Sequence, residues 1–145
     1  MKREHDKSYL RQIHELPCVL TGRPVVHAAH IRYHAAGKRQ VGMGEKPDDK
    51  WVVPLCPDLH TMLAGAQHNH NERLWWEHVG VDPVKLATEL YKYRDDPQWQ
   101  QEILALSMPS DPVYIERITQ LLNPKEQDNG KQGNRPGTRR LRGGL

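Results

Sequence analysis

Several features that stabilise or locate proteins are scarce in this chain. Its 145 residues include no phenylalanine, only 37% hydrophobic residues and two cysteines. Two cysteines cannot cross-link a small secreted fold, so thiols or metal ligands in a reducing compartment are expected. No apolar run approaches the roughly 18 residues of a membrane-spanning helix, and the charged start MKREHDKSYLRQ lacks the apolar stretch of a signal peptide. We therefore expect a cytoplasmic protein that has no contact with membranes.

Most of the chain has no net positive charge, and the excess of Lys and Arg lies at its C-terminal end. The formal net charge is +3, yet residues 125–145 alone carry six Lys or Arg against two Asp or Glu. This segment is rich in Gly and Arg and has no apolar periodicity, which predicts a disordered basic tail. A flexible basic segment gains affinity for DNA by releasing counterions from the phosphates. Arg139, Arg140 and Arg142 are therefore candidate DNA contacts.

The first half of the chain mixes helical and strand patterns. Residues 4–16 have apolar side chains at helical spacing and predict one amphipathic helix. Residues 25–33 and 50–56 predict two paired strands, and the Gly-containing stretch between them, residues 34–49, predicts a loop. A further helix is expected to begin at about Asp58.

The second half is predicted to be helical. A helix is expected to begin near His70 and to end at Gly80, a residue that suits a helix C-cap. Three Asp-Pro pairs follow, and each predicts a helix start, because Asp is a good N-cap and Pro is favoured at the first helical position. These pairs begin at Asp82, Asp96 and Asp111.

Histidine is abundant, with nine residues, most of them between His27 and His78. Along the chain, a strand with His30 is followed by a long loop, a strand that ends at Cys56, and a helix that carries His60. The short motifs in this order are HAAHIRY, KPDD, VPLCPDLH and QHNHNERLWWEHVGVDP. Together they resemble the HNH, or ββα-metal, nucleases, and especially a phage-encoded subgroup of recombination that includes a RecA-dependent nuclease.

The resemblance implies an α+β fold with a small hairpin-and-helix core surrounded by several α-helices. It divides the chain into an N-terminal helix in residues 1–17, a nuclease core in residues 18–83 and C-terminal helices in residues 84–124. The basic tail, residues 125–145, completes the chain.

The resemblance also assigns roles to individual residues. His30 corresponds to the general base, a role that suits imidazole because its pKa lies near physiological pH. His60 corresponds to a metal ligand on the helix. The second ligand usually follows one turn later, but Ala64 stands there, and the subgroup supplies a histidine from a QHxxxE stretch instead. His68 matches that histidine, and His70 is the competing candidate.

Two departures from the family pattern leave alternatives open. Ala29 stands where many members have a metal ligand directly before the base, and His27 is the candidate to replace it, although a packing role is equally compatible. The middle Asn of the motif has no counterpart, and Asp49 is its best substitute. A turn-capping role for Asp49 is the alternative.

Other residues near the expected site have less specific interpretations. Lys38, Arg39 and Lys46 lie in the loop between the strands and are candidate phosphate contacts, with an ordinary solvated loop as the alternative. Cys18 and Cys56 hold half of each CxxC pair that binds structural zinc in many members of the family. Two ligands cannot close such a site, so we expect the cysteines to be packed neighbours.

The expected activity is metal-dependent hydrolysis of DNA phosphodiester bonds, as an endonuclease or nickase. The resemblance implies Mg²⁺ or Mn²⁺ as the cofactor, with Zn²⁺ able to occupy the site. It implies DNA as the substrate, a RecA-like recombinase as a possible partner, and a phage or prophage origin in a bacterial cell. The alternative is a degenerate module of the same fold that binds DNA or a recombinase without cleaving.

Overall fold

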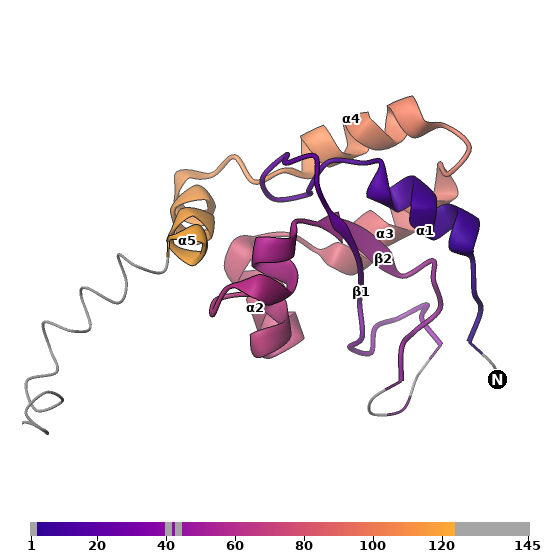
Figure 1. Ribbon diagram of the computed structural model, residues 1–145, viewed down its shortest axis with the longest axis horizontal. Coiled ribbons are helices and arrows are strands. Elements are labelled where there is room, and N and C mark those ends of the chain that lie inside the picture. The colour runs from indigo at the N-terminus through magenta and orange to yellow at the C-terminus, as the bar shows by residue number, and fades with distance from the viewer. Residues whose placement is uncertain (1–2, 40–41, 43–44, 124–145) are drawn as a thin grey trace, which may run out of the picture.

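The computed structural model of the protein describes residues 3–39, 42 and 45–123, with a two-stranded sheet surrounded by helices (Figure 1). The mixture of helices and strands makes the fold α+β. The predicted tail, including Arg139, Arg140 and Arg142, lies outside the described residues. The elements in chain order are α1 (Lys7–His14), β1 (His27–His30), β2 (Val52–Leu55), η1 (Asp58–Met62), η2 (Gln67–Asn69), α2 (Glu72–Val79), α3 (Pro83–Lys92), α4 (Pro97–Ser107) and α5 (Pro112–Leu122).

The two strands form the antiparallel pair that the sequence predicts, although each is shorter than expected. His27 lies opposite Leu55, and His30 lies opposite Val52. Every residue of β2 is buried, because helices cover the sheet: α1 packs against both strands and α3 packs against β2. The two histidines of β1, by contrast, are only partly buried, so their rings can contact other polar groups.

The helix starts and stops follow the capping pattern of the sequence. The side chains of Asp82, Asp96 and Asp111 each accept hydrogen bonds from backbone N–H groups in the first turn of α3, α4 and α5. Gly80 ends α2 in the left-handed conformation, with φ of 78°. This confirms the predicted caps, which are worth about 1 kcal/mol each in typical helices.

The core joins the sheet to helices from α1 to α5. Ile13 of α1, Leu59 of η1, Trp76 of α2 and Leu90 of α3 are among its largest fully buried side chains. Trp75 is buried beside Trp76, with the two rings edge to face. In the described part of the chain, no helix is long and apolar enough to cross a membrane.

Candidate metal centre

Three histidines from three different elements converge at one end of the sheet. The Nδ1 atoms of His27 in β1 and His60 in η1 are 2.9 Å apart. The ring of His68 in η2 lies on the other side of His60, with the ring centroids 4.5 Å apart. We call these three residues the histidine cluster.

Two irregular turns place His60 and His68 in this cluster. In η1 the N–H of Leu63 donates to the carbonyl of Asp58, five residues earlier, over 3.1 Å. This is a π-helical turn, a form often found at functional sites. The following bend is held against α2 because Trp75 Nε1 donates to the carbonyl of Gly65 over 2.8 Å. The bend shortens the path from η1 to η2 and returns His68 to the ring of His60.

The histidine cluster favours neutral imidazoles. Burial, and then the nearby His68 and His27, together lower the pKa of His60 to about 4. His68 is exposed at the edge of the cluster, and its partial removal from water is the main reason why its pKa is lowered. Metal ions bind the neutral form of histidine, and these shifts keep His60 and His68 in that form at neutral pH.

One buried nitrogen of the cluster has no hydrogen-bond partner. The Nε2 atom of His60 is buried and forms no hydrogen bond with any described residue, although an unpaired buried polar atom typically costs about 1–3 kcal/mol. When His60 donates from Nδ1 to His27, its Nε2 carries a lone pair that suits a cation. The three imidazoles therefore fit a divalent metal by their chemistry.

The cluster is not arranged as a finished coordination shell. Within residues 3–39, 42 and 45–123, no group of three or more His, Cys, Asp or Glu side chains has the geometry of a metal site. Nδ1 of His27 and Nδ1 of His60 face each other in a hydrogen bond. If both ligate through Nδ1, binding requires this bond to break.

A second histidine group lies at the other end of β1. His30 Nε2 is 2.9 Å from Oδ1 of Asp49, and Arg3 Nη2 donates to the same oxygen over 2.6 Å. The other oxygen, Oδ2, accepts from the backbone N–H of Asp6 over 2.8 Å. Because the carboxylate accepts the Nε2 proton, the Nδ1 atom of His30 carries the lone pair.

The charges in this second group are set by burial and hydrogen bonds. Burial is the largest influence on His30 and lowers its pKa, while Asp49 partly opposes the shift. Burial alone would raise the pKa of Asp49, but hydrogen bonds from Asp6, His30 and Arg3 outweigh it, and the pKa is lowered. At neutral pH the pair therefore consists of a carboxylate and a neutral imidazole, an arrangement that can accept a proton.

The chain directly after β1 is held from two sides. The carboxylate of Glu72 accepts from the N–H groups of Arg32 and Tyr33, over 2.9 and 3.0 Å. The ammonium of Lys38 donates to the carbonyls of Ile31 and Tyr33, the second over 2.8 Å. These contacts fix the end of the strand that carries His30.

This placement corrects the expectation for Lys38. Its side chain is buried, only 7% exposed, and burial lowers its pKa. Two of the three donors of this ammonium hold backbone carbonyls, and its burial keeps it away from the surface where a phosphate would bind. Arg39 is likewise bound, because its Nη2 donates to Asp48 Oδ1 over 2.8 Å.

Two other cations lie beside the candidate site with exposed side chains. Lys46 is exposed, and its charge contributes to the lowered pKa of both His30 and His68. Arg32 is exposed as well, and its charge acts on His60 and His68. Of the three basic loop residues expected to contact phosphate, Lys46 is therefore placed to bind an anion. Arg32, which was not expected, is placed to do the same.

The remaining sequence candidates have simple placements. His70 is exposed, and its Nε2 lies 3.1 Å from the carbonyl of Ala64, outside the histidine cluster. Cys18 and Cys56 are buried free thiols, as expected for packed neighbours. The N–H of Cys56 donates to Cys18 Sγ over 3.3 Å. Hydrogen bonds from Cys56 are the main cause that lowers the pKa of Cys18 to about 5.

The sequence offered little to identify Arg3 or Arg32 as site residues. Arg3 reaches Asp49 from 46 residues away, and no local pattern marks such a contact. Arg32 could have been noticed as a basic residue two positions after His30, on the same strand face by alternation.

Comparison with known proteins places the chain in a family. The model of the family described as Protein of unknown function (DUF968) matches residues 1–90, which is more than half of the chain. The protein therefore belongs to this family, and both histidine groups lie within the matched residues. No curated protein and no solved structure matches the chain.

Proposed function

We propose that this protein is a metal-dependent DNA endonuclease or nickase of the HNH type. The observation that supports this most is the pairing of two histidine groups on one short strand: His30, oriented by a carboxylate, and the histidine cluster. The two groups are close enough for charge on His30 to lower the pKa of His60. A two-strand unit followed by a turn that carries a ligand is also the order of elements expected from the resemblance.

The cluster would hold the metal through His27, His60 and His68. When bound, a divalent ion supplies positive charge that neutralises the scissile phosphate and the leaving oxygen. Imidazole ligands suit transition metals, whereas Mg²⁺ prefers oxygen. The residues present therefore favour Zn²⁺ over the Mg²⁺ or Mn²⁺ expected from the sequence.

His30 would act as the general base. Its Nε2–H donates to Asp49, which leaves Nδ1 to take a proton from the attacking water. The ionised Asp49 then stabilises the imidazolium that forms and keeps the ring in one orientation. Arg3, which donates to Asp49 and lies 3.4 Å from His30 Nε2, holds the carboxylate in place.

The exposed cations Arg32 and Lys46 would bind phosphates on either side of the cleaved bond. Such contacts position the backbone without selecting a sequence. The resemblance adds recombination or processing of phage or prophage DNA as the process, with a RecA-like recombinase as the candidate partner and the bacterial cytoplasm as the location.

A second candidate function is DNA or recombinase binding without cleavage, by a degenerate member of the same fold. The observation in its favour is the unfinished coordination geometry of the described residues. A cluster whose imidazoles bond to one another is stable without an ion, which a module that has lost catalysis would tolerate.

The test is nicking of supercoiled plasmid by the purified chain with Mn²⁺, Zn²⁺ or Mg²⁺, compared with EDTA. We expect cleavage with at least one metal, and a loss of about 100-fold or more in His30→Ala, the usual scale for a general base. His78→Ala is the matched control, because His78 is exposed on α2 and has no proposed role.

Thermal unfolding of both variants shows whether they are folded. Full cleavage by folded His30→Ala would refute the base assignment. No cleavage by the wild-type chain with any metal, together with retained DNA binding, would favour the second candidate.

A further inference from the structure

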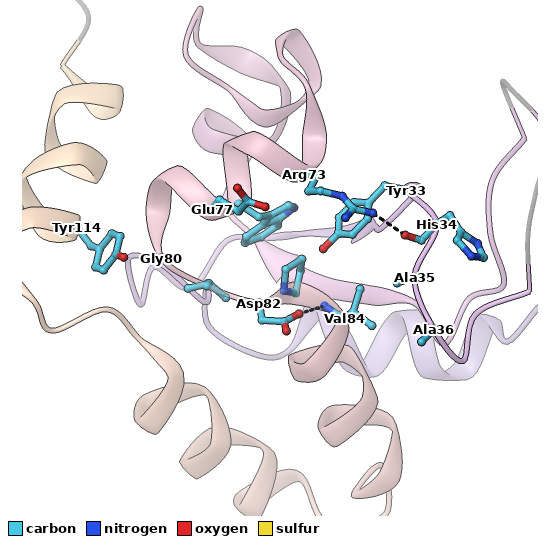
Figure 2. A pocket seen from close by; sticks show the side chains of 13 residues that line it. Tyr33, His34, Ala35, Ala36, Arg73, Glu77, Gly80, Asp82, Val84 and Tyr114 are labelled. Carbon is cyan, nitrogen blue, oxygen red and sulfur yellow. Dashed lines mark hydrogen bonds between the residues drawn. The ribbon is translucent and has the colours of Figure 1, made fainter.

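An open cleft lies on the side of α2 that faces the chain after β1. It has a volume of about 740 Å³, within the range of small-molecule sites. Its walls come from the loop after β1, from α2 and the turn into α3, and from α5. Figure 2 shows Tyr33 and Arg73 on one side of the cleft and Tyr114 on the other, with Glu77 and Asp82 between them.

A glycine allows the cleft to form. Gly80 has φ of 78°, and a Cβ atom at this position would lie 2.7 Å from the ring of Tyr114. The ring of Tyr114 therefore rests on the bare backbone of Gly80. Arg117 holds α5 in this position by donating from Nη1 to the carbonyl of His78 over 3.1 Å.

The opposite wall is an aromatic ring in a fixed position. The guanidinium of Arg73 lies over the ring of Tyr33, 4.9 Å from its centroid, and Arg73 Nη2 donates to the carbonyl of His34 over 2.9 Å. Glu72 holds the N–H of Tyr33. Each wall of the cleft therefore contains a half-buried tyrosine with an arginine over its ring, Arg73 on Tyr33 and Arg117 on Tyr114, the latter 5.3 Å from the ring centroid. Aromatic rings and guanidinium planes both stack on nucleobases.

Between these walls the cleft is acidic. In the described part of the chain, neither Glu77 nor Asp82 forms an ion pair. Asp82 caps α3 through Oδ1 alone. Burial, and then the charge of Asp82, raises the pKa of Tyr33 to about 12, so its phenol stays neutral. Carboxylates repel phosphates but accept hydrogen bonds from amino groups.

The cleft is also close to His30. Tyr33 follows His30 by three residues, which span at most about 10 Å. Arg32 stands between them and acts electrostatically on the histidine cluster. A strand whose phosphate lies beside His30 would therefore bring the base of a neighbouring nucleotide to the cleft.

We propose that this cleft binds one unstacked nucleobase of the DNA strand, and that it prefers a base with an exocyclic amino group. Tyr33 and Tyr114 supply the stacking faces, and Glu77 and Asp82 accept from the amino group. Adenine, cytosine and guanine carry such a group, whereas thymine does not. The inference rests on the proposed nuclease function and defines its substrate as a strand with an unstacked base beside the cleaved bond.

The test measures binding without cleavage. Fluorescein-labelled oligo(dT) of twelve nucleotides is compared by anisotropy, in EDTA, with the same strand carrying one central dC, dA or dG. We expect at least one amino-bearing base to tighten binding about tenfold, close to what one hydrogen bond to a charged acceptor is worth. The double variant Glu77→Gln with Asp82→Asn should remove the preference while it still binds oligo(dT).

Asn replaces Asp82 because both residues cap helices well, which keeps α3 intact. Glu102→Gln, an exposed change on α4, is the matched control and should keep the preference. Tyr114→Ala should weaken the binding of every oligonucleotide by removing one stacking face.

The outcomes separate this inference from the nuclease proposal. A base preference that the double variant removes would support the cleft even if the wild-type chain cuts no DNA. Equal binding of all four strands, or a preference that survives the double variant, would overturn the inference even if the wild-type chain nicks plasmid. No binding of any strand would also overturn the inference, whereas plasmid nicking with metal decides the nuclease proposal.

Discussion

The two histidine groups at the ends of β1 differ in how completely their polar atoms are paired. Around His30, both oxygens of Asp49 accept hydrogen bonds from side-chain or backbone donors. In the histidine cluster, the buried Nε2 of His60 has no partner among the described residues. The polar atoms of Asp49 are paired within the protein, whereas one buried nitrogen of the histidine cluster is not. Folding therefore orients the proposed base, and the proposed metal site would need a rearrangement on binding.

The largest expected effect is on metal affinity, where the cluster can be broken without touching His30. His60→Ala removes the central imidazole and should weaken Zn²⁺ binding about 1000-fold, since roughly 10–16 kcal/mol of structural zinc affinity is shared by about four ligands. Isothermal titration calorimetry measures this. His70→Ala is the control and should bind like the wild type, because His70 lies outside the cluster. An equal loss in both variants would contradict the ligand assignment.

The next largest effect is expected from a change in the His30 group, in which both oxygens of Asp49 accept hydrogen bonds. Asp49→Asn keeps the size of the side chain but removes the charge that fixes the His30 tautomer, so cleavage should fall about 100-fold. Plasmid nicking measures the rate, and calorimetry should show unchanged Zn²⁺ affinity. Asp58→Asn, which changes a half-exposed carboxylate paired with Arg23, should keep full activity. A loss of metal binding in Asp49→Asn would mean that the two groups are not separate.

A smaller effect, on stability, is expected from Lys38, which holds the chain directly after β1. Lys38→Met removes the donor to the carbonyls of Ile31 and Tyr33 and should lower the free energy of unfolding by about 2 kcal/mol. Urea denaturation measures the change. Lys85→Met, on the exposed side of α3, should change it by less than about 0.5 kcal/mol. Equal stability of the two variants would show that Lys38 is not a structural residue.

The smallest expected effect is the dependence of folding stability on pH that Asp49 causes. The pKa of Asp49 is lowered in the folded protein, so its contribution to stability is full above the ordinary Asp range, near pH 4. It is lost as pH falls through the lowered folded-state value, with a slope of at most about 1.4 kcal/mol per pH unit. Denaturation curves from pH 5 to pH 3 should be steeper for the wild type than for Asp49→Asn. Parallel curves would contradict the assigned pKa direction.

Local patterns predicted most elements but not their lengths. The Asp-Pro caps at Asp82, Asp96 and Asp111 were correct because a cap is a contact between residues two or three positions apart. The strands were predicted too long, from residues 25–33 and 50–56, because apolar residues continue beyond the hydrogen-bonded ladder. The turn at Asp58 was expected as a helix but closes as a single π-helical turn.

The histidines chosen from the family pattern lie near one another in the structure, while their catalytic and metal-binding roles stay predictions. The two histidines that the family pattern assigned most directly, His30 and His60, each lie in one of the groups, and His27 and His68 join His60. Lys38 was misplaced because a lysine in a glycine-containing loop is usually exposed, and only the packing around Trp51, which the Lys38 ammonium approaches to 5.8 Å, shows that it is buried.

The sequence by itself determined the helix boundaries marked by Asp-Pro, the pairing of two apolar strands, and the supply of imidazoles and cations. These follow from contacts between near neighbours and from intrinsic side-chain chemistry. Only the tertiary structure decided that Arg3 holds Asp49, that His27 meets His60, and that Tyr114 faces Tyr33 across a cleft. These arrangements join segments 33 to 81 residues apart. They depend on the angles at which helices and strands pack, and no local sequence pattern specifies those angles.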